Sequence, residues 1–414
     1  MSDDFDPARV RPLFPALARR VGGHAALFLD APGGTQAPQP VVDAVADYLA
    51  HVNANYGGVF ATSRETSELV AQARAATAAF LNSPYPDGIV FGANMTTLTF
   101  AFSRALARTW RAGDEVVVTS LDHDANVASW MLAAEDRRAT VRTLRCEADG
   151  ALSVARLREV LSPRTRVVAL TVASNAIGTI PDLAPLVRAA HDVGALVFLD
   201  AVHAAPHLPL DVLALECDAL ACSAYKFGGP HLGILWAQRG LLEQTAAYKV
   251  RPSPATGPGK WETGTQSFEA IAGLLAVLRY LGGLGADGGE ALGRLALERA
   301  MQRIQRHELA LTGRFLTGAR TIPGLHVHGI ADPARSAERT PTFGLTFDRI
   351  TPQAACERLA ARGVFAWAGN FYAIGLVEQL GLAGSGGLLR LGFAHYHDAA
   401  DVDRALAELK ALAG

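Results

Sequence analysis

Short, nearly continuous apolar runs recur through the middle of the chain. Five of them predict β-strands: Glu115–Thr119, Arg166–Val172, Leu196–Asp200, Ala219–Ser223 and Leu232–Trp236. Continuous apolar runs are typical of strands that are covered on both faces. Apolar residues between Leu183 and Val193 recur at helical spacing, which predicts a helix between two of the strands. This alternation indicates an α/β domain with a mostly parallel sheet and helices on both faces.

A glycine-rich stretch, Gly282–Gly289, interrupts this pattern. A helical pattern ends near Tyr280, and a long one runs from Glu290 to about Thr317. No strand pattern precedes the glycines, so a connector is favoured over a nucleotide-binding loop.

The part of the chain after the glycine-rich stretch predicts a smaller α+β domain. Strand patterns lie at Phe343–Phe347 and Leu388–Phe393, and a closing helix is expected over Ala399–Ala413. A chain of 414 residues is too long for one compact core. We therefore expect three parts: an N-terminal segment (1–25) that packs on the small domain, a large domain (26–281) and a small C-terminal domain (290–414).

Charge and cysteine content exclude several classes of protein. The formal net charge of −2 provides no basic field for nucleic acid or an anionic membrane. The acidic start, Met1–Asp6, lacks the features of a signal peptide, and no apolar run is long enough to span a bilayer, so we expect a cytoplasmic protein. The cysteines are spaced for neither a disulfide framework nor a zinc site: Cys146, Cys217, Cys222 and Cys356.

Polar residues lie at or just beyond the ends of four of the predicted strands. In chain order they are His123, Asn175, the pair Asp200 and His203, and the pair Ser223 and Lys226. Ligands of open α/β sheets bind beyond the carboxyl ends of the strands. We therefore expect these side chains to share one crevice.

Lys226 and Asp200 together indicate pyridoxal 5′-phosphate (PLP). A lysine made neutral by burial is a good nucleophile for a Schiff base with the cofactor. A carboxylate such as Asp200 keeps the pyridine nitrogen protonated and makes the ring an electron sink. Each residue alone has an ordinary alternative, an exposed loop lysine and a turn aspartate.

A phosphate cradle is expected where Gly92–Thr97 opens a helix after the strand pattern Ile89–Phe91. Backbone N–H groups at a helix start bind phosphate, which makes Met95 and Thr96 candidates. An ordinary helix cap is the alternative for this segment.

Three further residues are candidates for direct contacts. His123 is placed to stack on the cofactor ring, and His203 to bond its phenolic oxygen, although either could be an ordinary core histidine. Arg390 lies inside an apolar strand pattern and needs an anionic partner. That partner is either a substrate carboxylate or a structural carboxylate of the small domain.

In order and spacing, these segments resemble the class V aminotransferases of PLP fold type I, in their cysteine desulfurase-like branch. The resemblance rests on Phe28–Gln36, Gly92–Thr97, Asp122–Asn126, Ser174–Thr179, Asp200–His203, Ser223–Lys226, Glu262–Thr265 and Arg390. It implies a homodimer with shared active sites, in which Thr265 reaches the partner's phosphate. It also implies that Asn175 contacts cofactor and substrate, and that Arg390 binds the carboxylate of an amino acid.

The chain departs from typical desulfurases in three places. Tyr225 precedes the lysine where they have histidine, and His203 stands where they have glutamine. Their mobile loop carries a nucleophilic cysteine, but Trp367–Ala373 has none, and Tyr372 occupies its approximate place as a substrate-side residue. Standard persulfide formation requires that thiolate and is not expected here.

Several reactions on an α-amino acid therefore stay open: transamination, β-elimination of sulfur or another leaving group, and desulfuration by an atypical route. A PLP-binding protein without catalysis is a further alternative. A nicotinamide-dependent dehydrogenase is disfavoured, because no G-x-G-x-x-G follows the first strand.

Overall fold

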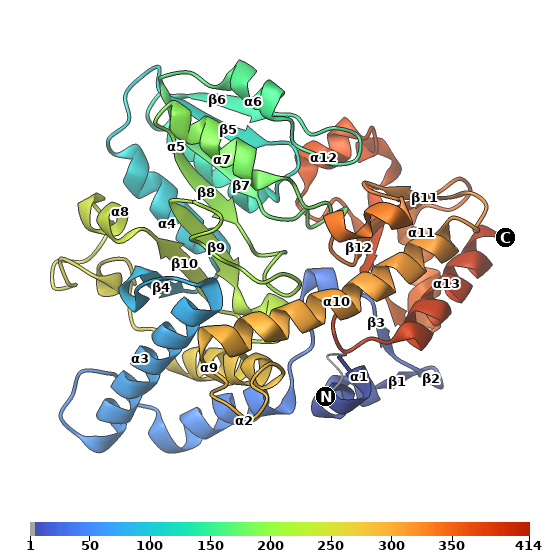
Figure 1. Cartoon of the computed structure of the whole chain (residues 1–414), viewed down its shortest axis with the longest axis horizontal. Coiled ribbons are helices and arrows are strands. Elements are labelled where there is room, and N and C mark those ends of the chain that lie inside the picture. Colours follow the sequence, from blue (N-terminus) through green and yellow to red (C-terminus); the bar gives the residue numbers. More distant parts are fainter. Residues whose placement is uncertain (1–4) are drawn as a thin grey trace.

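A seven-stranded sheet organises the larger part of the chain in the computed structural model, which describes residues 5–414 (Figure 1). In spatial order its strands are β4 (Ile89–Gly92), β10 (Gly233–Ala237), β9 (Ala219–Ser223), β8 (Leu196–Asp200), β7 (Thr165–Thr171), β5 (Glu115–Thr119) and β6 (Thr140–Leu144). Strands β9, β8, β7, β5 and β6 run parallel, and β10 is antiparallel to both of its neighbours. The predicted mostly parallel sheet is confirmed.

Helices cover both faces of the sheet because the strands are apolar on both sides. In β8, Val197 and Leu199 belong to one core cluster, and Phe198 belongs to the other. The first face is covered by α3 (Ala61–Leu81), α7 (Leu183–Asp192) and α9 (Phe268–Gly283), and the second by α4 (Met95–Ala107) and α5 (Ala128–Glu135). The other helices of this part are α2 (Gln39–Asp47), α6 (Val154–Val160) and α8 (Arg239–Gln244).

The small domain is built on an antiparallel sheet in the order β11 (Leu325–His328), β12 (Thr342–Phe347), β15 (Leu388–Gly392) and β14 (Trp367–Gly369). Its core joins this sheet to α10 (Arg294–Ala319), α11 (Pro352–Ala361) and α13 (Ala399–Ala413). Helix α12 (Ile374–Gln379) follows β14, and β13 (Val364–Phe365) pairs with β3 (Leu27–Phe28).

Long helix α10 links the two parts of the chain, packing on α9 at one end and on α13 at the other (Figure 1). It begins at Arg294, four residues later than expected, because turns continue through the glycine-rich stretch, where Gly288 has a φ of 90°. The domain limits drawn from the sequence stay a prediction.

Several elements add to the expected set, among them α3 and β6. Helix α3 spans 21 residues, many of them alanine or small polar residues, with only weak amphipathic character. Strand β6 lies at the edge of the sheet, where only Leu144 is buried. Neither α3 nor β6 carries the apolar pattern from which the expected strands and helices are predicted.

The N-terminal segment lies against the end of the chain. Within the expected 1–25 segment, residues 1–4 lie outside the described residues. From α1 (Pro7–Val10) the chain passes through two short helical turns and strands β1 (Arg20–Val21) and β2 (His24–Ala25). The Phe14 ring packs against Tyr280 and Tyr396, and Arg11 forms an ion pair with Asp398.

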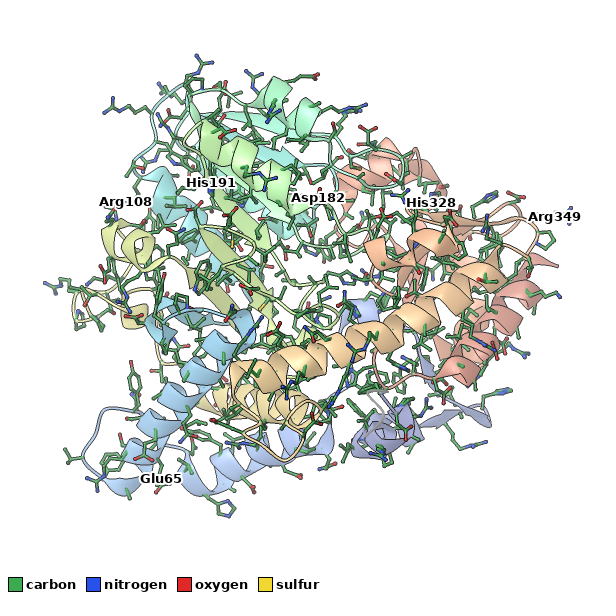
Figure 2. All side chains as sticks on the ribbon, viewed as in Figure 1. Glu65, Arg108, Asp182, His191, His328 and Arg349 are labelled. Carbon is green, nitrogen blue, oxygen red and sulfur yellow. The ribbon has the colours of Figure 1, made fainter. Side chains whose placement is uncertain are left out.

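Charged side chains cover the outside of the ribbon, as the labelled Glu65, Arg108 and Arg349 show (Figure 2). Among residues 5–414, no helix combines the length and the apolarity that crossing a membrane requires.

Candidate active site

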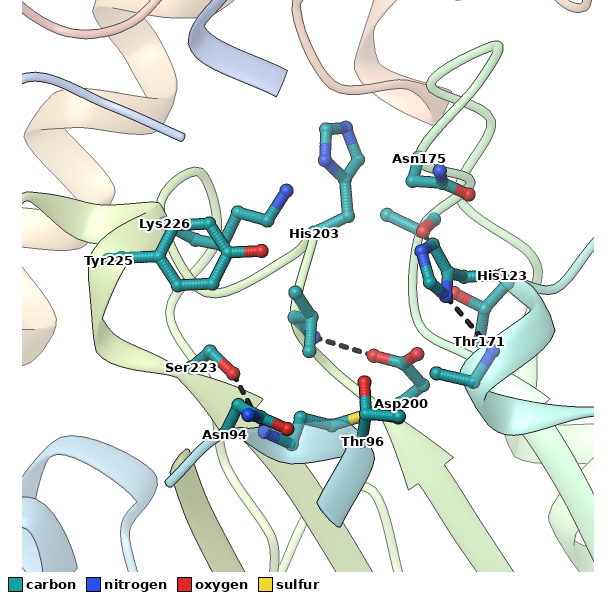
Figure 3. Close-up of a pocket in the computed structure, with 14 residues that line it drawn as sticks. Asn94, Thr96, His123, Thr171, Asn175, Asp200, His203, Ser223, Tyr225 and Lys226 are labelled. Atoms are coloured by element: carbon teal, nitrogen blue, oxygen red, sulfur yellow. Dashed lines mark hydrogen bonds between the residues drawn. The ribbon is translucent and has the colours of Figure 1, made fainter. Parts of the chain in front are cut away.

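The carboxyl ends of the parallel strands open into one pocket (Figure 3). All the predicted cofactor-binding residues except Thr265 line it: Met95, Thr96, His123, Asn175, Asp200, His203, Ser223 and Lys226. In Figure 3, Asn94, Thr96 and Ser223 gather at one end, and Tyr225 and Lys226 face His123 and Asn175 across the space. The shared crevice expected from the strand ends is therefore present.

Lys226 lies in a 3-10 turn directly after β9, with only 8% of its surface exposed. Its Nζ donates to the carbonyl oxygens of Pro32 at 2.6 Å and Gly33 at 3.2 Å. Burial, together with the Arg390 cation, lowers the pKa of this amine to about 7, against the opposite effect of Asp200. Near neutral pH, a large share of Lys226 is therefore an uncharged nucleophile.

Asp200 closes β8 with its carboxylate buried. Burial raises its pKa to about 6 against two opposing effects, those of the Val202 amide, which donates to Oδ1 at 2.8 Å, and of the Lys226 cation. No lysine, arginine or histidine of residues 5–414 forms a salt bridge with it. A buried carboxylate of this kind is suited to a cationic ligand atom.

The opposite end of the pocket is a site for an anion. Helix α4 begins at Met95, whose N–H donates to Ser223 Oγ at 3.0 Å, and Asn94 caps the helix by accepting from Thr97 N–H at 2.9 Å. Thr96 lies in the first turn and also lines the pocket. Helix-terminal N–H groups flanked by hydroxyls form a phosphate cradle.

His123 and Asn175 stand together on one wall. Burial, together with the cations of Lys226 and Arg390, lowers the pKa of His123 to about 4. The ring is therefore neutral near pH 7 and can stack on a cationic ring without charge repulsion. Asn175 donates through Nδ2 to the carbonyl of Phe371 at 2.9 Å, but its Oδ1 is buried without a partner.

His203 also has an unpaired buried atom. Its Nε2 is bonded to Thr342 Oγ1 at 3.0 Å, and its Nδ1 has no partner. Unpaired buried polar atoms are rare in folded proteins. The unpaired atoms of His203 and Asn175, the anion cradle, the neutral amine and the buried carboxylate all fit PLP.

Arg390, in β15, is a buried cation that forms no salt bridge among the described residues, although the charge of the nearby buried Asp30 carboxylate raises the pKa of its guanidinium against the lowering effect of burial. Its side chain is 7% exposed, and its one hydrogen bond runs to the Asn175 carbonyl at 2.9 Å. Its guanidinium carbon lies 4.1 Å from the centre of the Phe371 ring. The structural salt bridge considered from the sequence is absent here, so most of the guanidinium donors remain for an anionic ligand.

The loop between β14 and α12 covers this side of the site. Phe371 and Tyr372 both have left-handed backbone, with φ of 56° and 57°. The Tyr372 carbonyl accepts from Asp124 N–H at 2.6 Å, and its ring lies 5.2 Å from that of His123. Tyr372 is 67% exposed, so it forms the outer edge of the site rather than its floor.

Thr265 lies elsewhere. It lines a separate surface cavity with Gly92, Ala93 and Thr97, beside the first turn of α4. The single chain therefore does not bring Thr265 to its own pocket.

Sequence reasoning missed some residues of the pocket. Asn94 and Thr171 line it, and the carbonyls of Pro32 and Gly33 hold the lysine. The position of Asn94 at the start of a helix was an available signal. No local sequence pattern predicts that the Pro32 and Gly33 carbonyls accept hydrogen bonds from Lys226.

Comparison with known proteins agrees with this geometry. Residues 27–405 match the model of the family "Aminotransferase class-V". A probable cysteine desulfurase of Streptomyces coelicolor is 31% identical over 96% of this chain and 95% of its own. The crystal structure of the cysteine desulfurase CsdA from Escherichia coli superposes with a TM-score of 0.84 at 26% identity, covering 98% of both chains.

A cystine C–S lyase, C-DES, shares the fold with a TM-score of 0.78 at 21% identity, covering 96% of this chain and 99% of its own. The family match spans the sheet, the pocket and most of the small domain. The chain therefore belongs to the class V aminotransferase family of PLP-dependent enzymes, with fold type I.

Proposed function

We propose that this PLP-dependent enzyme acts on a small α-amino acid and eliminates a group from Cβ, in the simplest case by cleaving a C–S bond. The released group leaves directly, without forming a persulfide on the enzyme. The relatives named as cysteine desulfurases support C–S chemistry. The observation that carries the proposal is the loop over the site, which presents Tyr372 and no thiol.

The four thiols are poorly placed for sulfur transfer. None lines the pocket. Cys217 and Cys222 are buried in the core, and burial raises the pKa of both thiols far above neutral pH. Cys146 is enclosed by Ser120 and Gln379, and burial also raises the pKa of its thiol. The Cys356 thiol donates to the Ala366 carbonyl at 2.9 Å. Sulfur transfer needs an accessible thiolate.

The residues that hold the cofactor have separable tasks. When bound, PLP supplies an electron sink for the charge that develops on the substrate. Lys226 would anchor the cofactor and would act as the base and acid that removes or returns the proton at Cα. Asp200 would supply the negative charge for the pyridine nitrogen. Ser223, Thr96 and the first turn of α4 at Met95 would hold the phosphate, and His123 would contact the ring.

Substrate binding is assigned to Arg390, Asn175 and Tyr372. Arg390 binds the α-carboxylate with the donors that the protein leaves unused, and Asn175 fixes the orientation beside it. That orientation decides which bond of Cα is broken. The Tyr372 phenol shields the site from water and stands where a leaving group would depart.

We also propose that the enzyme is a homodimer with active sites shared between subunits. The exposed position of Thr265, away from its own pocket, supports a contact with the phosphate of the partner subunit. A cytoplasmic location stays a prediction.

Product analysis with a panel of amino acids tests the reaction. For L-cysteine, L-cystine and O-acylated serine, elimination gives pyruvate and ammonia in equal amounts, together with the leaving group. Alanine together with an enzyme persulfide would contradict the proposal, as would transfer of the amino group to a keto acid. Lys226→Ala is the inactive control, and a variant with all four cysteines changed to serine should keep the product pattern.

A further inference from the structure

A tryptophan next to Arg390 has no task in the site described above. Trp367 opens β14 and lies directly opposite Arg390 of β15 in the antiparallel pair. Residues that lie opposite each other in such a pair have their side chains on the same face of the sheet. Trp367 is 55% exposed, and its indole N–H forms no hydrogen bond with the described residues. An unused donor therefore stands beside the buried guanidinium.

The two side chains converge on one glycine. A Cβ atom at Gly33 would lie 3.2 Å from Trp367 Nε1 and 3.6 Å from Arg390 Nη2. Because glycine lacks this atom, a space stays open between the two nitrogen donors. Gly33 is not among the glycines with left-handed backbone, so its conformation would also suit alanine. At this position the missing side chain matters for the space that it leaves.

This space adjoins the reactive amine. The Gly33 carbonyl accepts a hydrogen bond from Lys226 Nζ at 3.2 Å. An α-amino acid carries its amine and its carboxylate on the same carbon. A substrate amine that reacts where the lysine amine lies would therefore bring its carboxylate close to Gly33. The two donors are placed where that carboxylate would need them.

The indole suits this position because it is a donor without charge. Arg390 donates through Nη1 to the Asn175 carbonyl at 2.9 Å, which leaves Nη2 for a ligand. A carboxylate has two oxygens and can accept from a second donor as well. The Arg390 cation already lowers the pKa of Lys226. A neutral N–H adds a hydrogen bond without a second positive charge beside that amine.

We propose that Trp367 is a substrate-binding residue, whose indole N–H and Arg390 together hold the α-carboxylate in the space over Gly33. This inference deepens the proposed function and rests on its assignment of Arg390 to the substrate carboxylate. It restricts the substrates to compounds that carry a carboxylate on the carbon that bears the amine. Simple amines would lose both contacts.

Binding of L-alanine and of ethylamine to the PLP-loaded enzyme tests the proposal, measured by the change in cofactor absorbance. The two ligands differ only in the carboxylate, and neither has a leaving group on Cβ. The wild-type protein should bind L-alanine more tightly. Trp367→Phe keeps an aromatic ring but removes the N–H. It should weaken the binding of L-alanine by roughly tenfold, as expected for one hydrogen bond to a charged group, and leave ethylamine within about twofold.

Gly33→Ala provides a second, independent variant. It fills the space with a methyl group while both donors remain, so it should also weaken L-alanine selectively. Gly384→Ala is the matched control, because Gly384 is exposed and a Cβ atom there would meet no other atom within 4 Å. It should leave both ligands unchanged. The pair also guards against a Trp367→Phe variant that disturbs the covering loop.

Unchanged binding of L-alanine in Trp367→Phe, or equal weakening of both ligands, would overturn the inference. If Arg390→Lys abolished the preference for L-alanine and Trp367→Phe did not, only the role of Trp367 would fail, and the assignment of Arg390 would stand. Equal affinities of the wild-type protein for the two ligands would overturn both. Because neither ligand can undergo elimination at Cβ, these results are separate from the product analysis that tests the reaction.

Discussion

Covalent capture of PLP by the apoprotein should follow the pH dependence of a strongly perturbed amine. Burial and Arg390 lower the pKa of Lys226 from 10.5 to about 7. That difference corresponds to about 5 kcal/mol disfavouring the charged form. At pH 7.5 about three quarters of Lys226 is then neutral, against about one part in a thousand for an ordinary lysine. The capture rate should therefore level off between pH 7 and 8.

Two substitutions should move this midpoint in opposite directions. Arg390→Gln removes a cation that disfavours the charged amine, so the midpoint should rise by roughly one pH unit. Asp200→Asn removes the carboxylate that favours the charged amine, so the midpoint should fall. Stopped-flow absorbance of the cofactor measures the rates, and borohydride reduction with peptide mapping verifies the attachment to Lys226. A rate that keeps rising tenfold per pH unit up to pH 10, or a common direction of shift in both variants, would refute this reasoning.

Other variants test the remaining assignments. Asp200→Asn should retain the fold by circular dichroism yet lower kcat by roughly a hundredfold or more, because an amide cannot stabilise a protonated pyridine nitrogen; near-normal kcat would remove Asp200 from the mechanism. Arg390→Lys should raise KM by roughly tenfold or more in steady-state assays, since lysine cannot bind a carboxylate through two parallel hydrogen bonds. Replacing all four cysteines by serine should leave kcat/KM within about twofold, and loss of turnover in a single Cys→Ser variant would restore the desulfurase assignment. Sedimentation should find a dimer, and a fully active monomer would exclude the shared site.

The parts of the site that are visible in the sequence are those encoded locally. Asp200 and Ser223 end apolar strands, and Lys226 follows one by three residues. The parallel sheet brings such strand ends together. The strands themselves were predictable because both of their faces are buried. Edge strand β6 has no such pattern, because only one of its side chains is buried.

Long-range pairing was beyond sequence reasoning. His207 and Glu308 are 101 positions apart and meet only because α10 runs along the side of the large domain. Similarly, the sequence suggested that Arg390 needs an anion but could not tell a structural carboxylate from a ligand. That choice depends on which acidic side chains the small domain brings near it.

The backbone of the covering loop has a consequence for access to the site. Left-handed conformation costs roughly 1–2 kcal/mol for each of Phe371 and Tyr372. Two hydrogen bonds offset part of this cost: Asn175 donates to the Phe371 carbonyl and Asp124 N–H to the Tyr372 carbonyl, and each stabilises the loop by roughly 1 kcal/mol. The total cost of roughly 2–4 kcal/mol equals or exceeds the roughly 2 kcal/mol from the two hydrogen bonds. The contacts of Phe371 with Arg390 and of Tyr372 with His123 therefore help to hold the loop over the site. A substrate that contacts Tyr372 would then favour the closed loop, and release of the product would favour the open one.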